Sequence, residues 1–506
     1  MTPTRKTALS ASLLLALATG GAAAQSSAAE PTRGGRLTVS VSAEPPMLDP
    51  TSSTSAEISR IMYDNVLQGL VKLGPDGKIV PSLASRFQVS ADGRTYTFTL
   101  RPNVKFHDGS AFGTDDVVAA LRRAMDPRSG HTHPEYYADM ASVTASGPNT
   151  VVIRLSRPNA DFLFNLARAD SVIMPAGKTD AMRSAPVGTG PFRFVSWQRG
   201  SAITLERNPA YYNTALPYLD AVTFRFIPDA NAQLAALRSG DIDVIGSGLA
   251  PENALSLRQG DGFNVIVGRS TNKVTLSMNN GRAPFNDIRV RRAVQYAVDK
   301  NAILQGVMLG NGRVLGTHRT PVESCYSDLA GLYRPNPQLS RSLLQQAGYT
   351  AQRPLRVTLT LPSQYEYAVR TGQAVAAQLN KVGIQTEIKL VDFSTWLKQV
   401  FQGGDYDMSV IGHAEPNDIG VYANKGYYFH YDSPRFREQF DSYQRTTNRS
   451  AACLAMRALQ KRLADDAVNV WVQELPYMAA MKSQVAGWWT DQPLPSLNVT
   501  QVYLRK

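Results

Sequence analysis

Short stretches of alternating apolar and polar residues recur along the chain and are joined by segments with apolar residues at helical spacing. Residues 95–100 show the clearest alternation, because Tyr96, Phe98 and Leu100 would share one face of a strand with threonines on the other. An Asp-Gly turn follows. Thr114 is the expected N-cap of a helix that carries two aspartates in its first turn and ends at an Asp-Pro dipeptide. This stretch therefore predicts strand, turn and capped helix.

The same patterns predict two α/β units elsewhere in the chain. The first contains expected strands at 192–197, 202–207 and 222–227. The second has the order strand, helix, strand, which is typical of a βαβ unit; its parts are expected at 355–361, 373–379 and 384–391.

Composition supports a globular protein with more than one core. The chain has 506 residues, of which 43% are hydrophobic and 19% charged. The formal net charge is +12, but the basic residues are scattered. The densest basic cluster, Arg289, Arg291 and Arg292, falls on an expected helix at 288–298, and we interpret it as a solvated helix face. We predict no nucleic-acid partner, because such a patch would gather on one surface.

The N-terminus has the pattern of a secretion signal. Arg5 and Lys6 precede an apolar stretch centred on 13–17, which is too short to span a bilayer. Small residues then predict cleavage after Ala24, with Ala29 as an alternative. No cysteine follows the stretch to carry a lipid anchor, so we expect a soluble protein exported to a periplasm.

The chemistry expected of enzymes and metal centres is missing from the sequence. We find no Gly-x-Ser-x-Gly, His-Glu-x-x-His or Cys-x-x-Cys motif, and we predict no catalytic residue, metal or cofactor. The two cysteines, Cys325 and Cys453, could form a disulfide in an oxidising compartment or stay unlinked, and the sequence leaves both open.

Six segments in order along the chain resemble the family 5 extracytoplasmic solute-binding proteins of ABC importers, the type that includes dipeptide-, oligopeptide- and nickel-binding proteins. They are SAEPPMLDP (42–50), LRPNVKFHDGSAFGTDDVVAALRRAMDP (100–127), GTGPF (188–192), LERNPAYY (205–212), ALRSGDID (236–243) and FNDIRVRRAVQYAVDKNAIL (285–304).

The resemblance implies an α/β fold of two lobes with a hinge between them, the type II periplasmic binding protein fold in its large form with three subdomains. It predicts these ranges: 1–24 signal peptide; 25–50 first part of lobe 1; 51–186 extra α+β subdomain of lobe 1; 187–272 central part of lobe 1; 273–480 lobe 2; and 481–506 the C-terminal return to lobe 1.

The resemblance also implies a ligand between the lobes. The loop after the first strand borders the cleft in this family, and cleft residues commonly follow a strand expected here at 407–411. The candidate ligand-binding residues are Glu44, Pro45, Tyr365, Trp396, His413, Glu415, Asp418 and Tyr422. Five of these have a second interpretation. Trp396 could instead pack a core, and Asp418 could be a turn or N-cap residue. Glu44 could be a solvent-exposed loop carboxylate, His413 an ordinary loop residue, and Tyr422 could pack the lobe surface.

In peptide binders of the family, an acidic residue receives the α-amino group of the ligand, because a desolvated ammonium needs a charged acceptor. Either Glu415 or Asp418 could take that role. The arginine that pairs with the carboxylate in dipeptide binders is missing from 362–367, which contains tyrosines instead.

We therefore predict a monomeric periplasmic protein that captures a small peptide or related amine-bearing solute by lobe closure and delivers it to the transmembrane subunits of an ABC permease. The alternatives are a binder of an opine-like solute, an oligosaccharide or a metal chelate, or, from another class, a secreted hydrolase.

Overall fold

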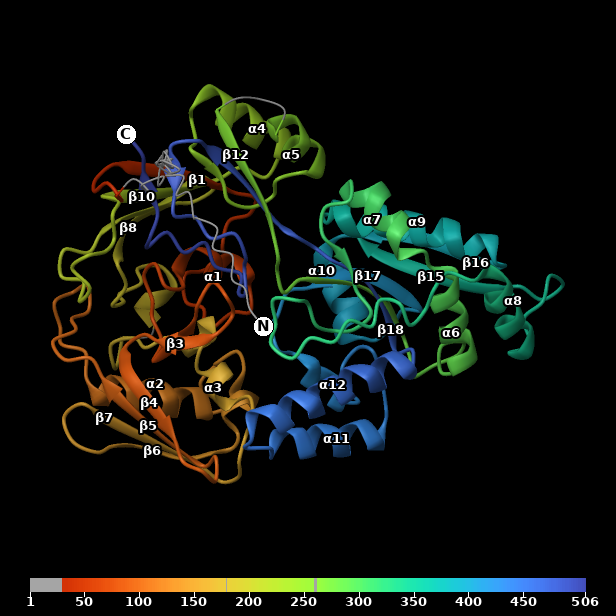
Figure 1. The fold of residues 1–506 in the computed structure, drawn as a ribbon, viewed down its shortest axis with the longest axis horizontal. Helices are drawn as coiled ribbons and strands as arrows, with labels where there is room; N and C mark the ends of the chain where they lie inside the picture. The colour runs from red at the N-terminus through yellow and green to blue at the C-terminus, as the bar shows by residue number, and fades with distance from the viewer. Residues whose placement is uncertain (1–29, 179, 259–261) are drawn as a thin grey trace, which may run out of the picture.

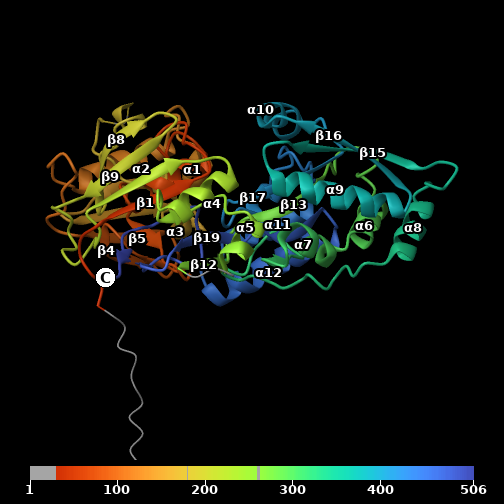
Figure 2. The same cartoon turned by 90° about the horizontal axis from the view of Figure 1, so that it is seen from above.

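The computed structural model describes residues 30–178, 180–258 and 262–506, so the predicted signal peptide at 1–24 lies outside the described residues. Two lobes lie side by side, as Figures 1 and 2 show from two directions. Each lobe is built on its own mixed sheet, and one of them carries an extra subdomain below that sheet in Figure 1. The predicted α/β fold with two lobes is confirmed.

The first lobe has a seven-stranded sheet in the order β12-β19-β11-β1-β10-β9-β8. β1 pairs in parallel with β10 and β11, while β8, β9 and β10 form the antiparallel run predicted from the sequence. The elements are β1 (Arg36–Val41), β8 (Phe192–Gln198), β9 (Ala202–Arg207), β10 (Ala221–Phe226), α4 (Ala230–Ser239), β11 (Val244–Ile245), α5 (Pro251–Arg258), β12 (Phe263–Gly268), β19 (Tyr477–Lys482), β20 (Val485–Ala486) and β21 (Tyr503–Leu504).

The extra subdomain is a four-stranded antiparallel sheet, β4-β5-β7-β6, covered by α2. Tyr96, Phe98 and Leu100 are buried on one face of β5, as the alternation predicted. The elements here are α1 (Ala56–Met62), β2 (Val71–Leu73), β3 (Ile79–Pro81), β4 (Ala84–Val89), β5 (Thr95–Leu100), α2 (Thr114–Met125), β6 (Met140–Ala145), β7 (Thr150–Leu155) and α3 (Phe162–Asn165).

The second lobe has a six-stranded sheet in the order β14-β18-β13-β17-β15-β16. The predicted βαβ unit is present, with β15 and β16 parallel and α9 between them. The elements are β13 (Lys273–Met278), α6 (Ile288–Ala297), α7 (Lys300–Met308), β14 (Arg313–Val314), α8 (Pro337–Gln346), β15 (Leu355–Pro362), α9 (Glu366–Lys381), β16 (Ile384–Val391), α10 (Phe393–Trp396), β17 (Met408–His413), α11 (Pro434–Gln444), α12 (Arg449–Asp465) and β18 (Asn469–Glu474).

The chain passes from one sheet to the other twice, between Gly268 and Lys273 and back between Glu474 and Tyr477. The two passages lie against each other. The Leu475 N–H donates to the Asn272 carbonyl at 2.9 Å, and the Ser270 N–H donates to the buried Glu474 carboxylate at 2.6 Å. The two lobes are therefore connected by two short chain segments, which are hydrogen-bonded to each other and form the hinge.

Two of the sequence motifs shared with the family pack against each other. His107, in the 100–127 motif, donates from Nε2 to the Gly190 carbonyl (3.0 Å) and accepts the Gly188 N–H of the 188–192 motif at Nδ1 (3.2 Å). A Cβ on either glycine would collide with the backbone at 65–66, so this turn requires glycine. Burial lowers the pKa of His107 to about 4, which keeps the ring neutral. These motifs join the extra subdomain to the first lobe.

The prediction of a solvated basic face on α6 is wrong for Arg291. Its side chain is buried, and its guanidinium donates to the Phe285 carbonyl at 2.7 Å and the Asp466 carbonyl at 2.9 Å. Arg289 and Arg292 are exposed as expected.

The two cysteines form a disulfide within the second lobe. Cys325 and Cys453 lie 5.1 Å apart between Cα atoms, and the bond joins the loop before α8 to α12. In the part of the chain that the structure describes, no helix combines the length and the apolar character needed to cross a membrane.

We expect the stability of the protein to depend on Glu474 between pH 5 and pH 8. Burial raises the pKa of Glu474 to about 7, more than the Ser270 N–H and the nearby arginines lower it. In the unfolded chain the Glu474 carboxyl ionises near pH 4.3. The protonated carboxyl therefore makes its full contribution to the unfolding free energy below that pH, and this contribution is lost as pH rises through 7. From pH 5 to pH 8 the wild type should lose about 2–3 kcal/mol of unfolding free energy that Glu474→Gln retains.

Urea unfolding of both proteins at the two pH values measures this difference. The exposed Glu387→Gln variant is the control and should follow the wild type. A gap between Glu474→Gln and wild type that does not change with pH would contradict the prediction.

Candidate functional site

A small pocket opens between the lobes. It is lined from the first lobe by residues that include Ser53, Thr54, Ser59 and Arg168, and from the second lobe by Glu415. Its volume is about 40 Å³, enough for a few water molecules and too small for a dipeptide. A larger solute can occupy this pocket only if the residues that close it move apart.

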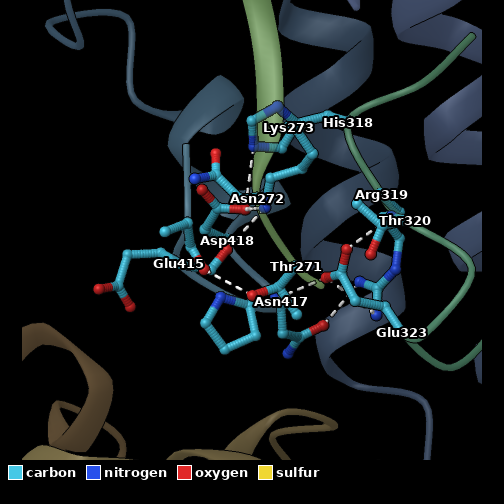
Figure 3. Close-up of polar contacts among 12 residues, drawn as sticks. Thr271, Asn272, Lys273, His318, Arg319, Thr320, Glu323, Glu415, Asn417 and Asp418 are labelled. Carbon is cyan, nitrogen blue, oxygen red and sulfur yellow. Dashed lines mark hydrogen bonds and ion pairs between the residues drawn. The ribbon is translucent and has the colours of Figure 1, made fainter. Parts of the chain in front are cut away.

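The loop after β17 is held by a fully buried lysine at the start of β13. Lys273 Nζ donates to the Glu415 carbonyl at 2.6 Å and to Asp418 Oδ1 at 3.0 Å (Figure 3). A buried ammonium is costly unless it is paired and hydrogen-bonded, and the loop supplies both partners. Lys273 therefore fixes the loop to the strand that directly follows the first passage between the lobes.

His318 completes the contacts of Asp418. Its Nε2 lies 2.9 Å from Asp418 Oδ1, and Trp471 Nε1 lies 3.2 Å from its Nδ1. An ionised carboxylate can only accept, so Nε2 carries a proton and donates to Asp418, while the Trp471 N–H lies 3.2 Å from both Nδ1 and the Tyr422 hydroxyl. Burial lowers the pKa of His318. Tyr422 lies against the same Nδ1 at 3.0 Å.

Burial raises the pKa of the Asp418 carboxyl, but His318 and the Lys273 ammonium lower it by more than burial raises it. The pKa of Asp418 therefore lies well below its ordinary value. Asp418 is therefore an ionised group whose charge is paired inside the second lobe. Its side chain makes no capping hydrogen bond to the short helix Ile419–Ala423 that follows it.

Glu415 differs from Asp418 because its carboxylate leaves the cluster. Its side chain is 42% exposed and points toward the extra subdomain (Figure 3), where Oε2 accepts from Arg168 Nη2. Arg168 is 6% exposed, lies 4.6 Å above the Tyr136 ring and has Asp170 at 3.5 Å from its Nε. This pair places opposite charges from the two lobes at one pocket.

Further contacts tie the same two surfaces together. Asp161, just before α3, accepts from the Tyr443 hydroxyl at 2.5 Å, from Asn417 Nδ2 at 2.7 Å and from Gln444. Figure 1 shows α11 and α12 beside α3, where these bonds form. On this side the lobes are in direct contact.

Of the eight candidate residues, the structure brings the side chains of His413, Asp418 and Tyr422 together around His318, and only the backbone carbonyl of Glu415 joins them, through Lys273. His413 Nε2 lies 2.8 Å from the Tyr428 hydroxyl. Burial lowers the pKa of His413 to about 3, so the ring is neutral.

Glu44 and Pro45 lie apart from this cluster, on the first lobe. Glu44 accepts from Trp197 Nε1 at 2.8 Å and from the Gly200 N–H at 3.0 Å, so both of its carboxylate oxygens are bonded to the β8–β9 hairpin of its own lobe. Pro45 is buried.

Tyr365 and Trp396 belong to an aromatic group around Phe393 in the second lobe. Trp396 is 2% exposed and donates from Nε1 to Ser409 Oγ at 2.9 Å, which supports its interpretation as a core residue. Tyr365 is half-buried, and burial raises the pKa of its hydroxyl, with a smaller effect from Glu57 of the first lobe. Tyr365 is thus more exposed than Trp396.

Sequence reasoning missed Lys273, His318 and Arg168. Lys273 lies in the TNKVTLSMNN segment, beside apolar residues of a buried strand. A lysine at such a position indicates a buried cation that needs an acidic partner, and this was the one available signal in the sequence. Arg168 and His318 lie in irregular segments that carry no periodic pattern. Within 30–178, 180–258 and 262–506, no group of three or more His, Cys, Asp or Glu side chains is arranged to hold a metal ion.

Comparison with known proteins gives one consistent result. Residues 78–430 match the family model described as bacterial extracellular solute-binding proteins, family 5 middle. The chain is 32% identical over 357 residues to the glutathione-binding protein GsiB of Pectobacterium atrosepticum, a match that covers 68% of this chain and 67% of the relative. It is 30% identical over 399 residues to the dipeptide-binding protein of Escherichia coli K12, covering 72% and 73%.

Among solved structures, the periplasmic binding protein AgaA from A. tumefaciens R10 in complex with agropinic acid has a TM-score of 0.81 and 28% sequence identity. The superposition covers 93% of this chain and 99% of that one. The ABC transporter-associated periplasmic binding protein DppA from Helicobacter pylori, in complex with the peptide STSA, has a TM-score of 0.82 at 24% identity. The superposition covers 94% of this chain and 99% of that one, and it supports the fold alone.

We expect Lys273→Met to destabilise the protein by about 3–5 kcal/mol, because it leaves the Asp418 carboxylate buried without its cation. The double variant with Asp418→Asn should regain part of the loss, since neither partner is then charged. Urea unfolding at pH 7 measures both variants. If the single and double variants lost equal stability, the pair would not be the reason for the effect.

Proposed function

The chain belongs to the family 5 bacterial extracellular solute-binding proteins of ABC transporters, and from this premise we propose that it captures a small amine-bearing solute, a short peptide or a related compound, between its two lobes. Proteins of this family bind solutes and are not enzymes, in agreement with the prediction of no catalytic residue. The resemblance read from the sequence motifs is confirmed.

The observation that carries the proposal is the pocket between the lobes with an ionisable group from each side. Arg168 comes from the first lobe and Glu415 from the second, and both line the pocket. A solute held there touches both lobes, so its binding favours the state in which they are close. The contacts of Asp161 with α11 and with Asn417 support closure on this side.

Glu415 is the better acceptor for a ligand amine than Asp418. The Asp418 charge is already paired with Lys273, and its Oδ1 receives two hydrogen bonds. The Glu415 carboxylate is partly exposed at the pocket, and among the residues that the structure describes its ion-pair partner is Arg168. An ammonium from a solute can replace that partner, and Arg168 then keeps Asp170 as its ionic partner.

The solutes named for the relatives agree with a compound of this size. Glutathione and dipeptides are small and carry a primary amine. An opine-like solute is the second candidate, and the agropinic acid complex of AgaA favours it. Delivery to the transmembrane subunits of an ABC permease, a periplasmic location and a monomeric state complete the proposal and rest on the family and on the predicted signal peptide.

We expect Glu415→Gln to weaken binding of an amine-bearing solute by about 2 kcal/mol, because an ammonium desolvated by closure loses its charged acceptor. Isothermal titration calorimetry with L-alanyl-L-alanine and glutathione measures the change.

The control for this prediction is Glu438→Gln, an exposed residue on α11, which should bind as the wild type does. Glu415→Gln should lose less unfolding free energy than Lys273→Met, because Arg168 keeps Asp170 as an ionic partner. An unaltered affinity for every solute that binds the wild type would remove Glu415 from the site.

A further inference from the structure

We propose that Asp161 sets the affinity of the protein from outside the solute pocket, by favouring the closed arrangement of the lobes whether or not a solute is bound. It is the centre of a contact between the extra subdomain and the second lobe, which we call the interlobe latch. The latch consists of Gly93 and residues 160–161 on one side, and of Asn417 and residues 443–447 on the other. This inference goes beyond the proposed function and rests on it only for the solute titrations in its test.

The Asp161 carboxylate is turned toward the second lobe. Asp161 occupies the N-cap position of α3, where an aspartate usually accepts an N–H of its own helix, but its side chain makes no such capping bond. Oδ1 instead accepts from the Tyr443 hydroxyl at 2.5 Å and from Asn417 Nδ2 at 2.7 Å, and Oδ2 accepts from Gln444 Nε2. The hydrogen-bonding capacity of this carboxylate is therefore used between the lobes and not within α3.

Two of the donors are held in place by their own lobe. Arg319 Nη1 donates to the Asn417 amide oxygen at 2.7 Å, and Glu323 accepts the Asn417 N–H at 2.9 Å (Figure 3). These bonds orient the side chain of Asn417 and leave its Nδ2 to bind the opposite lobe. Tyr443 packs against Phe440 on α11. Because both side chains are already ordered, closure costs little of their rotamer entropy.

Backbone contacts extend the latch on both sides of Asp161. The Ala160 N–H donates to the Gln444 carbonyl at 2.8 Å. At the turn between β4 and β5, a Cβ on Gly93 would lie 2.7 Å from Thr447 Cγ2, so this turn fits closely against the second lobe. Figure 1 shows the extra subdomain and the α11–α12 pair in contact here. The latch is therefore an extended surface with Asp161 at its centre.

The latch is separate from the pocket in which we propose that the solute binds. That pocket is lined by other residues, among them Arg168 and Glu415. Contacts that leave the pocket lining untouched stabilise the closed state equally for every solute. The apparent dissociation constant is the intrinsic one divided by the fraction of protein in the binding-competent state. A latch that raises this fraction therefore lowers the dissociation constants of all solutes by one common factor.

Small-angle X-ray scattering of the purified protein without added solute tests the latch directly. We expect Asp161→Ala to have a larger radius of gyration than the wild type, because the open state gains population. Asp115→Ala, on an exposed aspartate of the same subdomain, should match the wild type. Tyr443→Phe removes one hydroxyl donor from the opposite lobe and should give an intermediate value, so the test holds even if Asp161→Ala fails to fold. Equal radii of gyration in the wild type and both latch variants would overturn the inference.

Calorimetric titration with L-alanyl-L-alanine and glutathione measures the effect on affinity. We expect Asp161→Ala to bind both solutes roughly 5- to 10-fold more weakly, by the same factor, and Tyr443→Phe about 2- to 3-fold more weakly. The double variant should bind no more weakly than Asp161→Ala alone, because both substitutions break one contact. A loss confined to one solute would place Asp161 in the solute site and overturn the inference, as would losses that multiply in the double variant.

The outcomes separate this inference from the proposed function. If neither solute bound the wild type, the proposed solute class would fail, and the scattering comparison would still decide whether the latch exists. If both solutes bound the wild type and the latch variants with equal affinity and the radii of gyration were equal, the latch would fail and solute capture would stand.

Discussion

The buried ammonium of Lys273 is the interaction on which the site depends. It lies on the first residue of β13, immediately after the chain passes between the lobes, and it holds the Glu415 carbonyl and the Asp418 carboxylate of a loop more than a hundred residues away. Loop and passage therefore move as one body with the second lobe. If one lobe rotates relative to the other, the Glu415 side chain moves toward Arg168 or away from it. Formation of this ion pair therefore depends on the relative position of the two lobes.

Much of the fold followed from local patterns. The alternation at Tyr96, Phe98 and Leu100, the βαβ unit and the strands at 192–227 were predictable because one face of each element packs against a core. The start of α2 was off by one residue. Gly113 takes the N-cap position because its N–H is bonded by the Asp116 carboxylate at 2.9 Å, which excludes Thr114 from that role. Arg291 was misplaced because periodicity does not show that other segments cover its face of the helix.

The candidate site was predictable in its loop and not in its partners. The resemblance located residues 413–422, and the structure places that loop at the pocket between the lobes. Lys273 and His318 occupy Asp418 and so leave Glu415 as the acid that reaches the pocket. The cation that faces Glu415 is Arg168, which is 247 residues away in sequence. Pairs so distant are created by the fold, and no spacing in one sequence identifies them. Trp396 had two interpretations from the sequence, ligand contact and core packing, and its burial supports the second.

The disulfide has a mechanical meaning in this architecture. Both sulfur atoms belong to the second lobe, where Gln460 also binds the Cys325 carbonyl from α12 at 2.9 Å. The disulfide thus stabilises the second lobe and places no covalent restraint between the two lobes. An oxidising compartment can therefore stabilise such a binding protein against unfolding without restricting its opening and closing. The disulfide lies within one lobe, whereas the movement takes place at the segments between the lobes.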